Sequence, residues 1–556
     1  MKFKSLATLT AAIVCCLSCI ESNSEMGGSL VPVDQTYQVY VSSVNLPNIK
    51  LMMADSLSGY SSSRITIGSI RDDKFGLTTR SSALTIVPLN DSLDFGDNPR
   101  VHKMHFAAAM DTTCITDPNL KNILQSVKVY ELLNPIDASK DFDCNKGLSH
   151  GSERISIGTP MINGKDSLSF DFSLNFAQKF LTITQEDLEK PEQYFKKIPG
   201  IYLETSEPHG EGGRINMFEL QLGYDSQQYL LTGNYARLDF TSTYKGVEKD
   251  TSFYFYYGAI DIIGADSLLT NFSRGSYPQY ALNLTGHNTR SLAGNTDEMS
   301  TIYFEGGGGL KPVFSASMLR DLACEMILEK ADDYKGVVIN RATLELPFDF
   351  PDDYTQMDRY PYILSPTCRL MTDSTATFMN LTDSSNQNEN QGNIDRSNLK
   401  FAPDITYHLQ ELVKINENDK LKMERLTNGS YDIWMLISAN EVTTSSSSSS
   451  SSNDMSEYYQ YLAYQSYYNN MYGGYGGYGG YGYGGYGYGG YGNSYYSNYY
   501  TYMMMAAYAN NSNNSTTSTT QMLDKDRYYM GWLNGPNHSQ RRPRLILTFS
   551  VPNKAR

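Results

Sequence analysis

The sequence predicts an all-β protein of two tandem antiparallel β-sandwich modules, jelly-roll-like, with few short helices and one long insertion. Most of the chain reads as short runs in which apolar and polar residues alternate and Val, Ile, Tyr, Phe and Thr are frequent. These runs also follow one another without the regular alternation of strands and helices that a parallel sheet requires. A length of 556 residues leaves room for two or more domains, each with its own core.

The chain begins with the pattern of a signal peptide, which we place at residues 1–18. Two lysines precede a mostly apolar stretch, residues 6–17, which is too short to span a bilayer because a spanning helix needs about 20 residues. Ser18 directly precedes Cys19, which resembles the lipobox of bacterial lipoproteins, where the cysteine is diacylated and becomes the new N-terminus. We therefore expect a lipid on Cys19 and a tether over residues 19–36. An ordinary secretory leader with an incidental cysteine is the alternative.

Individual strands and helices follow from the same patterns. The clearest predicted strands are residues 167–176, 236–244, 251–257, 336–347, 432–439 and 543–551. A helix is predicted over residues 315–333, where Ser315 is a favourable N-cap and five apolar residues share one face. Those residues are Met318, Leu319, Leu322, Met326 and Ile327. Residues 184–198 and 404–415 are the other helix candidates.

We place the boundary between the modules after the 315–333 helix, so that they span residues 37–334 and 335–556. The second module is interrupted by a low-complexity segment, residues 443–522, which holds eight consecutive serines and a Tyr–Gly tract. Dense Gly and Ser with few aliphatic side chains predict a disordered loop between neighbouring strands. An adhesive or self-associating loop of stacked Tyr rings is the other interpretation.

The charge balance argues against nucleic acid as a partner. The chain has 45 Lys and Arg against 60 Asp and Glu, a net charge of −15. Phosphate backbones and anionic lipid headgroups are therefore poor partners. The Tyr–Gly tract also lacks the interleaved cations that a single-stranded nucleic acid needs. We expect contact with the membrane through the lipid anchor, and we expect no cofactor.

Four cysteines follow the leader, and they are Cys114, Cys144, Cys324 and Cys368. An even number in an exported chain allows two disulfides, and the pairs nearest in sequence are Cys114–Cys144 and Cys324–Cys368. Four cysteines permit three connectivities, so the other pairings stay open. No two of them have the close spacing of a zinc site, and we predict no metal.

The candidate catalytic motif is weak, and we predict no enzymatic activity. Residues 147–151 (GLSHG) match the G-x-S-x-G pattern of a nucleophile elbow around Ser149. A true elbow needs a buried strand before the serine and a helix after it. Here polar residues precede the motif and residues 152–157 are expected to form a strand, which favours a loop.

Acidic pairs and histidines complete the candidate sites. Carboxylate pairs occur at residues 72–73, 332–333 and 352–353, but none has the spacing of a calcium loop, which favours acidic turns. His102 and His105 are expected on opposite faces of one strand, where they cannot chelate the same ion. His408 is expected to pack against its helix or to lie at the surface.

A recurrent triplet has two interpretations of equal weight. Asp, then Ser or Thr, then an aliphatic residue or Thr resembles the O-glycan acceptor pattern of Bacteroidota envelope proteins. The six candidate acceptors are Ser56, Ser92, Thr112, Ser167, Ser267 and Ser374. In the other interpretation the Asp-Ser pair ends a turn and the aliphatic residue begins a strand.

Five segments together resemble the Bacteroidota lipoproteins grouped as domain of unknown function 4270. They are residues 67–76 (IGSIRDDKFG), 127–132 (VKVYEL), 195–202 (FKKIPGIY), 304–310 (FEGGGGL) and 338–346 (VINRATLEL). In the fourth segment Glu305 stands where the family has Gln, and its four glycines predict a tight turn. The resemblance implies an all-β lipoprotein of the outer membrane, and it implies no catalytic residues.

We therefore predict a non-catalytic outer-membrane or cell-surface lipoprotein with a structural, assembly or ligand-binding role in the cell envelope. Its expected partner is an envelope protein or a glycan. One alternative is a glycan-binding or adhesive surface protein, for which exposed Tyr rings and an exposed Trp532 would be the sign. A hydrolase is a weaker alternative, because it requires Ser149 or a carboxylate pair beside a base in a deep pocket.

Overall fold

The computed structural model describes fifteen segments of the chain. They are residues 36–55, 57–61, 64–89, 93–111, 123–136, 143–164, 167–220, 222–225, 230–257, 262–263, 280–334, 336–371, 376–385, 390–445 and 516–553. Within them the predicted all-β fold is confirmed, because antiparallel sheets dominate and the helices are few and short. The leader, Cys19 and Cys114 lie outside these residues, as do five candidate glycan acceptors, Ser56, Ser92, Thr112, Ser267 and Ser374. No helix in the described segments is long and apolar enough to cross a membrane.

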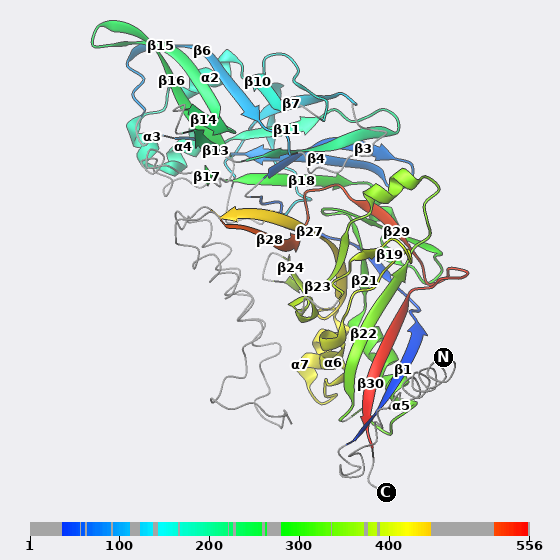
Figure 1. The fold of residues 1–556 in the computed structure, drawn as a ribbon. Helices are drawn as coiled ribbons and strands as arrows, with labels where there is room; N and C mark the ends of the chain where they lie inside the picture. The colour runs from blue at the N-terminus through cyan, green and yellow to red at the C-terminus, as the bar shows by residue number, and fades with distance from the viewer. Residues whose placement is uncertain are drawn as a thin grey trace, which may run out of the picture.

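The strands gather in two units, shown at the top and bottom of Figure 1. The first unit, the described residues between 57 and 287, packs a five-stranded sheet against an eight-stranded one. The five-stranded sheet has the order β10 (Leu168–Asp171), β6 (Asp97–Ala108), β15 (Ala236–Tyr244), β16 (Val247–Tyr257) and β5 (Ile86–Pro88). The eight-stranded sheet runs β12 (Gly212–Glu219), β3 (Arg64–Asp72), β4 (Gly76–Leu84), β11 (Ile201–Thr205), β7 (Gln125–Leu132) and β8 (His150–Arg154), with β18 (Ala281–His287) on β4 and β9 (Met161–Ile162) on β7.

Aromatic rings fill the core of the first unit. Phe106 stacks on Phe170 and on Tyr257, with ring centroids 4.8 and 4.3 Å apart. Three short helices cover this core: α2 (Leu174–Phe180), α3 (Gln185–Glu189) and α4 (Pro191–Lys197). A small sheet of β14 (Leu230–Gly233), β13 (Leu222–Asp225) and β17 (Ile262–Ile263) completes the unit.

Two sequence predictions in this region need correction. The strand predicted over residues 167–176 stops at Asp171, because Ser173 caps α2 by accepting a bond from the Phe176 N–H. The helix predicted over residues 184–198 is two helices, since Pro191 starts the second one.

The second unit, residues 36–55 and 289–553, is also built of facing sheets. One sheet has the order β1 (Tyr37–Asn45), β30 (Arg544–Pro552), β22 (Val338–Pro347), β26 (Lys400–Phe401) and β25 (Ile394–Asp395). The other runs β19 (Gly294–Asn295), β2 (Lys50–Met53), β21 (Leu310–Phe314), β27 (Ile433–Ser445), β23 (Ile363–Met371) and β24 (Ala376–Asn380), with β28 (Thr516–Leu523) on β27. A pair of β20 (Thr301–Glu305) and β29 (Met530–Asn534) adjoins them.

The helices of the second unit agree largely with the sequence patterns. The predicted helix after Ser315 is α5 (Ala316–Leu328), and the Ser315 hydroxyl accepts a bond from the Met318 N–H as an N-cap. The predicted helix at residues 404–415 is α6 (Thr406–Val413), whereas α7 (Lys420–Thr427) was not predicted. Three short 3-10 helices are η4 (Thr289–Leu292), η5 (Tyr354–Arg359) and η6 (Thr382–Ser385).

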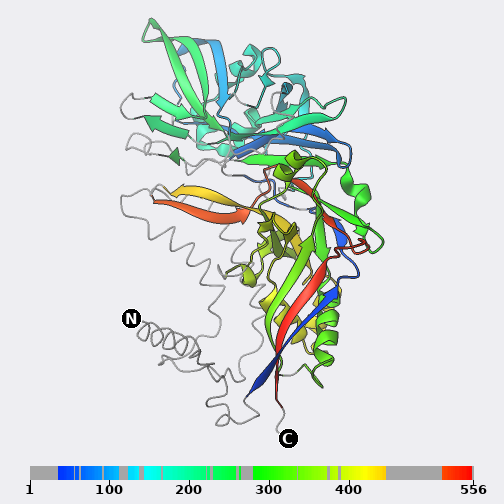
Figure 2. The same cartoon turned by 45° about the vertical axis from the view of Figure 1, so that its right-hand side comes forward.

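The predicted module boundary after residue 334 is wrong. β1 pairs along its whole length with β30, from Tyr37 opposite Pro552 to Asn45 opposite Arg544. Residues of β2, β21 and α5 share one hydrophobic core with strands from the C-terminal half. The first unit is therefore inserted into the second, and Figure 2 shows the blue β1 beside the red β30.

The predicted low-complexity loop also has different limits. β27 continues to Ser445 and pairs with β28, which begins at Thr516, so residues 443 and 522 lie within strands. The partner of β27 across this segment is β28, not the predicted strand at residues 543–551, which belongs to the other sheet. Residues 446–515, with the Tyr–Gly tract, lie outside the described residues.

A buried polar cluster between the two units as candidate functional site

The two units meet where the eight-stranded sheet faces β20, β29 and the segment before β29. Part of this contact is apolar, because Ile70, Phe75 and Ile215 of the first unit pack with Tyr528 and Met530 of the second. Beside it lie ionisable side chains that are buried or, for Asp526, partly buried, and we call five of them the interface cluster. Its members are Arg80, His287, Glu305, Lys311 and Asp526.

Glu305, the last residue of β20, joins the two units directly. Its fully buried carboxylate accepts hydrogen bonds from the Thr78 hydroxyl (3.2 Å) and the Thr289 hydroxyl (2.5 Å). His287 Nδ1 lies 3.3 Å from the same carboxylate. Burial alone favours the neutral acid, but His287, Thr289 and Lys311 outweigh it and hold the pKa of Glu305 below its ordinary value. Glu305 is therefore a buried anion, held by Thr78 and His287 of the first unit and by Thr289 of the second.

Lys311 fixes the turn that follows Glu305. Its buried ammonium group donates to three main-chain carbonyls, those of Glu305, Gly307 (2.9 Å) and Gly309 (3.1 Å). Burial lowers the pKa of Lys311 to about 7. The three N–H groups of the ammonium each bond one carbonyl, so all its hydrogen-bond donors are used. Lys311 therefore holds the turn and has no N–H left to bind a ligand.

The four glycines at residues 306–309 form the tight turn that the sequence predicts, and they also pack against polar side chains. Gly307 has φ +57°, and a Cβ there would lie 2.3 Å from a terminal nitrogen of Arg80. At Gly308 a Cβ would lie 2.6 Å from Asn145 Oδ1, and at Gly309 it would lie 2.6 Å from the Glu305 Cβ. The turn needs glycine because the interface cluster leaves no space for larger residues.

Arg80 lies in the middle of β4 and is fully buried against this turn. Among the described residues none accepts a hydrogen bond from its three guanidinium nitrogens. Burial lowers the pKa of Arg80, and the opposing charges of Asp526 and Glu305 offset part of that effect. The charge of Arg80 is thus balanced over a distance by carboxylates of the second unit.

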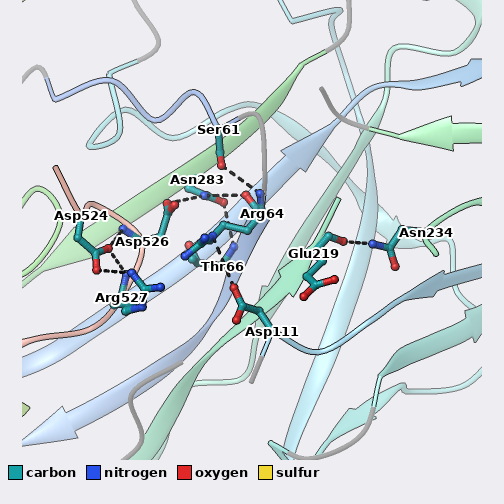
Figure 3. Close-up of polar contacts among 10 residues, drawn as sticks. All are labelled: Ser61, Arg64, Thr66, Asp111, Glu219, Asn234, Asn283, Asp524, Asp526 and Arg527. Carbon is teal, nitrogen blue, oxygen red and sulfur yellow. Dashed lines mark hydrogen bonds and ion pairs between the residues drawn. The ribbon is translucent and has the colours of Figure 1, made fainter. Parts of the chain in front are cut away.

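Asn283 makes a further polar contact between the two units, and Figure 3 shows it beside Asp526. Its side-chain oxygen accepts bonds from the Thr66 N–H (2.9 Å) and the Ser82 hydroxyl (2.8 Å). Its amide group donates to Asp526 (2.8 Å) and to the Arg64 carbonyl (3.2 Å). Asn283 therefore ties β3 and β4 of the first unit to the segment that leads into β29. Burial raises the pKa of Asp526.

Further ion pairs border the interface cluster in Figure 3. Asp524 accepts from Arg527 at 2.7 Å within the second unit. In the first unit Arg64 lies 3.6 Å from Asp111. Burial, with the nearby charge of Asp111, raises the pKa of Glu219. No group of three or more His, Cys, Asp or Glu side chains in the described segments is arranged to hold a metal ion.

The opposite end of the contact between the units is closed by charged side chains of the first unit. Asp72 of the predicted acidic pair caps the turn after β3 and binds Arg359 of the second unit at 3.0 Å. Lys74 lies over the ring of Trp532, 4.6 Å from its centroid, and the Tyr360 ring packs against the same side chain. Trp532 is therefore only partly exposed, and its ring is in contact with both side chains.

The remaining predicted residues are dispersed. Ser149 lies in an exposed loop that leads into strand β8, as the loop interpretation predicts, and Ser167 is exposed directly before β10. Asp353 caps η5, while residues 332–333 are exposed.

The three histidines singled out from the sequence have separate partners. His102 contacts the Thr241 hydroxyl, whereas His105 Nδ1 lies 2.6 Å from Asp171. His408 is buried on α6, where its Nε2 bonds the Tyr431 carbonyl at 3.1 Å. Burial lowers the pKa of His408 to about 4, so this histidine is neutral and has a packing role.

The predicted disulfide Cys324–Cys368 is wrong, because both residues are free thiols. Each packs against the core of the second unit as a small apolar side chain, Cys324 from α5 and Cys368 from β23. Cys144 is buried near the Thr285 hydroxyl and has no disulfide within the described segments. Its predicted partner Cys114 lies outside those segments, so the pair Cys114–Cys144 stays a prediction.

Sequence analysis did not identify Arg80, His287, Lys311 or Asp526. The sequence offered one sign of this cluster. Arg80 and Lys311 are charged residues that stand alone in otherwise uncharged runs, residues 76–84 and 310–314. Comparison of the chain with models of protein families, with curated proteins and with solved structures gives no match. The resemblance to the lipoproteins of domain of unknown function 4270 thus stays a prediction.

Proposed function

We propose that this chain is a lipid-anchored protein of the outer membrane that acts without catalysis, as a structural, assembly or ligand-binding component of the cell envelope. The observation that supports this proposal is the junction between the units. Two of its buried charges are fully bonded: Glu305 of the second unit binds Thr78 and His287 of the first unit and Thr289 of its own, and Lys311 holds the glycine turn that follows Glu305. Ionisable groups used in this way hold two sandwiches in one orientation, which suits a scaffold.

The position of β1 directly after the expected tether supports the proposed lipid anchor. The expected tether, residues 19–36, ends where β1 begins at Tyr37. Extended, such a tether reaches up to about 60 Å, since a residue spans about 3.3 Å. The second unit is then the part of the body attached directly to the anchor. The resemblance to envelope lipoproteins supports the same proposal.

The first experiment separates membrane and soluble fractions of cells that express wild type or Cys19→Ala. We expect wild type in the outer-membrane fraction and the variant in the soluble fraction or stalled in export. Normal processing and unchanged membrane retention of Cys19→Ala would reject the anchor. Protease treatment of whole cells then assigns the periplasmic or the outer face, and a pull-down from detergent-solubilised membranes identifies partners.

A glycan-binding function is the second candidate, because one stretch of the second unit carries exposed rings. Phe350 and Tyr354 have exposed fractions of 57 and 75%, and Tyr362 is 62% exposed with Arg396 over its ring, 5.5 Å from the centroid. Exposed aromatic faces can stack on sugar rings. If this stretch binds glycans, replacing Phe350 and Tyr354 with alanine abolishes binding on a glycan array while the melting temperature stays unchanged. No binding by wild type would exclude this candidate.

A further inference from the structure

Strand β1 forms a free edge of its sheet. In the order β1-β30-β22-β26-β25 it stands at one end, and β30 is its only strand partner among the described residues. The pairing with β30 covers all nine residues, Tyr37–Asn45, without a bulge. In Figures 1 and 2 this strand lies on the outer side of β30. A long and regular edge is thus available for another strand.

The hydrogen-bonding pattern shows which residues face outward. The Thr36 carbonyl accepts from the Asn553 N–H, and the Leu46 N–H donates to the Pro543 carbonyl, both at 2.9 Å. Main-chain groups of successive residues in an antiparallel pair point alternately toward and away from the partner. Even-numbered residues of β1 therefore bond to β30. The odd-numbered residues, Tyr37, Val39, Val41, Ser43 and Asn45, direct their N–H and C=O groups to the free edge.

This edge lacks the usual protection against strand pairing. Natural edge strands carry lysine, proline, inward charges or bulges that prevent addition of a further strand. The sequence of β1, YQVYVSSVN, contains no charged residue and no proline. Tyr37, Val39 and Val41 are also exposed, with fractions of 53, 59 and 73%. In a chain of net charge −15, an uncharged edge is a place where two copies can approach with little local repulsion.

We propose that β1 pairs with β1 of a second copy of this chain, antiparallel and about a two-fold axis at Val41. In this register Val41 faces Val41, Val39 faces Ser43 and Tyr37 faces Asn45. Every outward-facing residue meets an outward-facing residue, so all nine positions pair without a shift. The two five-stranded sheets become one continuous sheet. A two-fold contact of this kind closes on itself and does not propagate into fibres.

The size of the contact sets where the dimer forms. Nine residues at about 3.3 Å each give an edge about 30 Å long. At a height of about 10 Å such an edge buries roughly 300 Å² per partner, which is less than the roughly 800 Å² of a stable interface. The dimer is therefore weak in dilute solution. Two copies anchored in one membrane have a raised effective concentration, which favours the pairing. This last step rests on the proposed lipid anchor.

The test is disulfide trapping with Val41→Cys in the full-length chain, in membranes and as purified anchor-free protein carrying Cys19→Ala. Facing residues of this type have Cα atoms about 5.5 Å apart, within the range of a disulfide. Val338→Cys is the matched control, because Val338 is 45% exposed on the same sheet but lies on β22, two strands from the edge. We expect a covalent homodimer for Val41→Cys and only monomer for Val338→Cys. Wild type measures any dimer made by the native cysteines.

A second variant tests the backbone pairing itself. The double variant Val39→Cys/Ser43→Cys should also form the covalent dimer, because Val39 faces Ser43 of the second copy. Adding Val41→Pro to it should abolish the dimer. Proline at this position removes an outward N–H but no hydrogen bond to β30. Monomer only from Val41→Cys, both in membranes and at high concentration of the anchor-free protein, overturns the proposal. A disulfide to a different protein also overturns it. A dimer in the concentrated anchor-free protein supports it even if fractionation rejects the anchor, so the two proposals fail separately.

Discussion

Replacing Glu305 with alanine should weaken the junction between the two units more than any exposed substitution. The change removes the acceptor of the Thr78 and Thr289 hydroxyls and the counter-charge of Lys311 and Arg80. Breaking a buried ion cluster by removing one partner costs about 3 to 5 kcal/mol. Glu305→Gln keeps an acceptor oxygen and the shape but loses the charge. We expect Glu305→Gln to cost about 1.5 to 3 kcal/mol, the scale of one hydrogen bond to a charged group.

Urea unfolding followed with two probes measures the loss of stability in Glu305→Ala and shows whether the two units still unfold together. The two tryptophans, Trp434 and Trp532, both lie in the second unit, so their fluorescence reports on that unit. Far-UV circular dichroism reports on the strands of both units. In wild type we expect the two curves to coincide, because the units unfold together. In Glu305→Ala we expect lower midpoints and separated curves.

Glu329→Ala is the matched control, because Glu329 is exposed at the end of α5. The loss in Glu305→Ala should also shrink at acid pH. Since the folded-state pKa of Glu305 lies below its ordinary value of 4.5, its contribution is present above 4.5 and is lost as the pH falls through the folded pKa. A Glu305→Ala protein with the midpoint of Glu329→Ala and coincident curves would refute this account of the junction.

Three further predictions concern other parts of the fold. Burial lowers the pKa of His408 from 6.5 to about 4, so the unfolded chain takes up a proton before the folded protein does. The free energy of unfolding of wild type should therefore fall by about 3 kcal/mol between pH 6.5 and pH 4. Urea unfolding of His408→Gln should show a smaller decrease over the same pH range. Gly307→Ala should cost more in melting temperature than Gly246→Ala, because both have positive φ but only Gly307 meets Arg80, and equal losses would contradict the packing. Replacing residues 446–515 with a short Gly-Ser turn should change stability by about 1 to 2 kcal/mol, since β27 and β28 already hold its ends together, and a variant that fails to fold would disprove this.

The sequence predicted where strands and helices lie better than it predicted which strands pair with each other. Alternation identified β15 and β30, and the Ser315 cap identified α5, because these signals are local. The pairing of β1 with β30 joins residues about 500 positions apart, and an alternating pattern carries no information about such a neighbour. The module boundary was placed wrongly for this reason.

The interface cluster could be predicted only in part. The glycines at residues 306–309 were identified as a turn, and Glu305 was noted as a departure from the family pattern. That Arg80 and His287 meet this turn depends on how two sheets face each other, which no local pattern specifies. The cysteines show the same limit, since spacing suggested a bond between Cys324 and Cys368 but each packs in the core as a free thiol.

The central claim, that this chain is a lipid-anchored protein of the envelope, depends on Cys19. The most direct measurement is the mass of the N-terminal peptide of the mature protein purified from its native membrane. We predict a peptide that begins at Cys19 and carries a diacylglyceryl group on its sulfur, with every residue of 1–18 removed. A mature N-terminus at another residue, or an unmodified Cys19 within a longer peptide, would contradict the account.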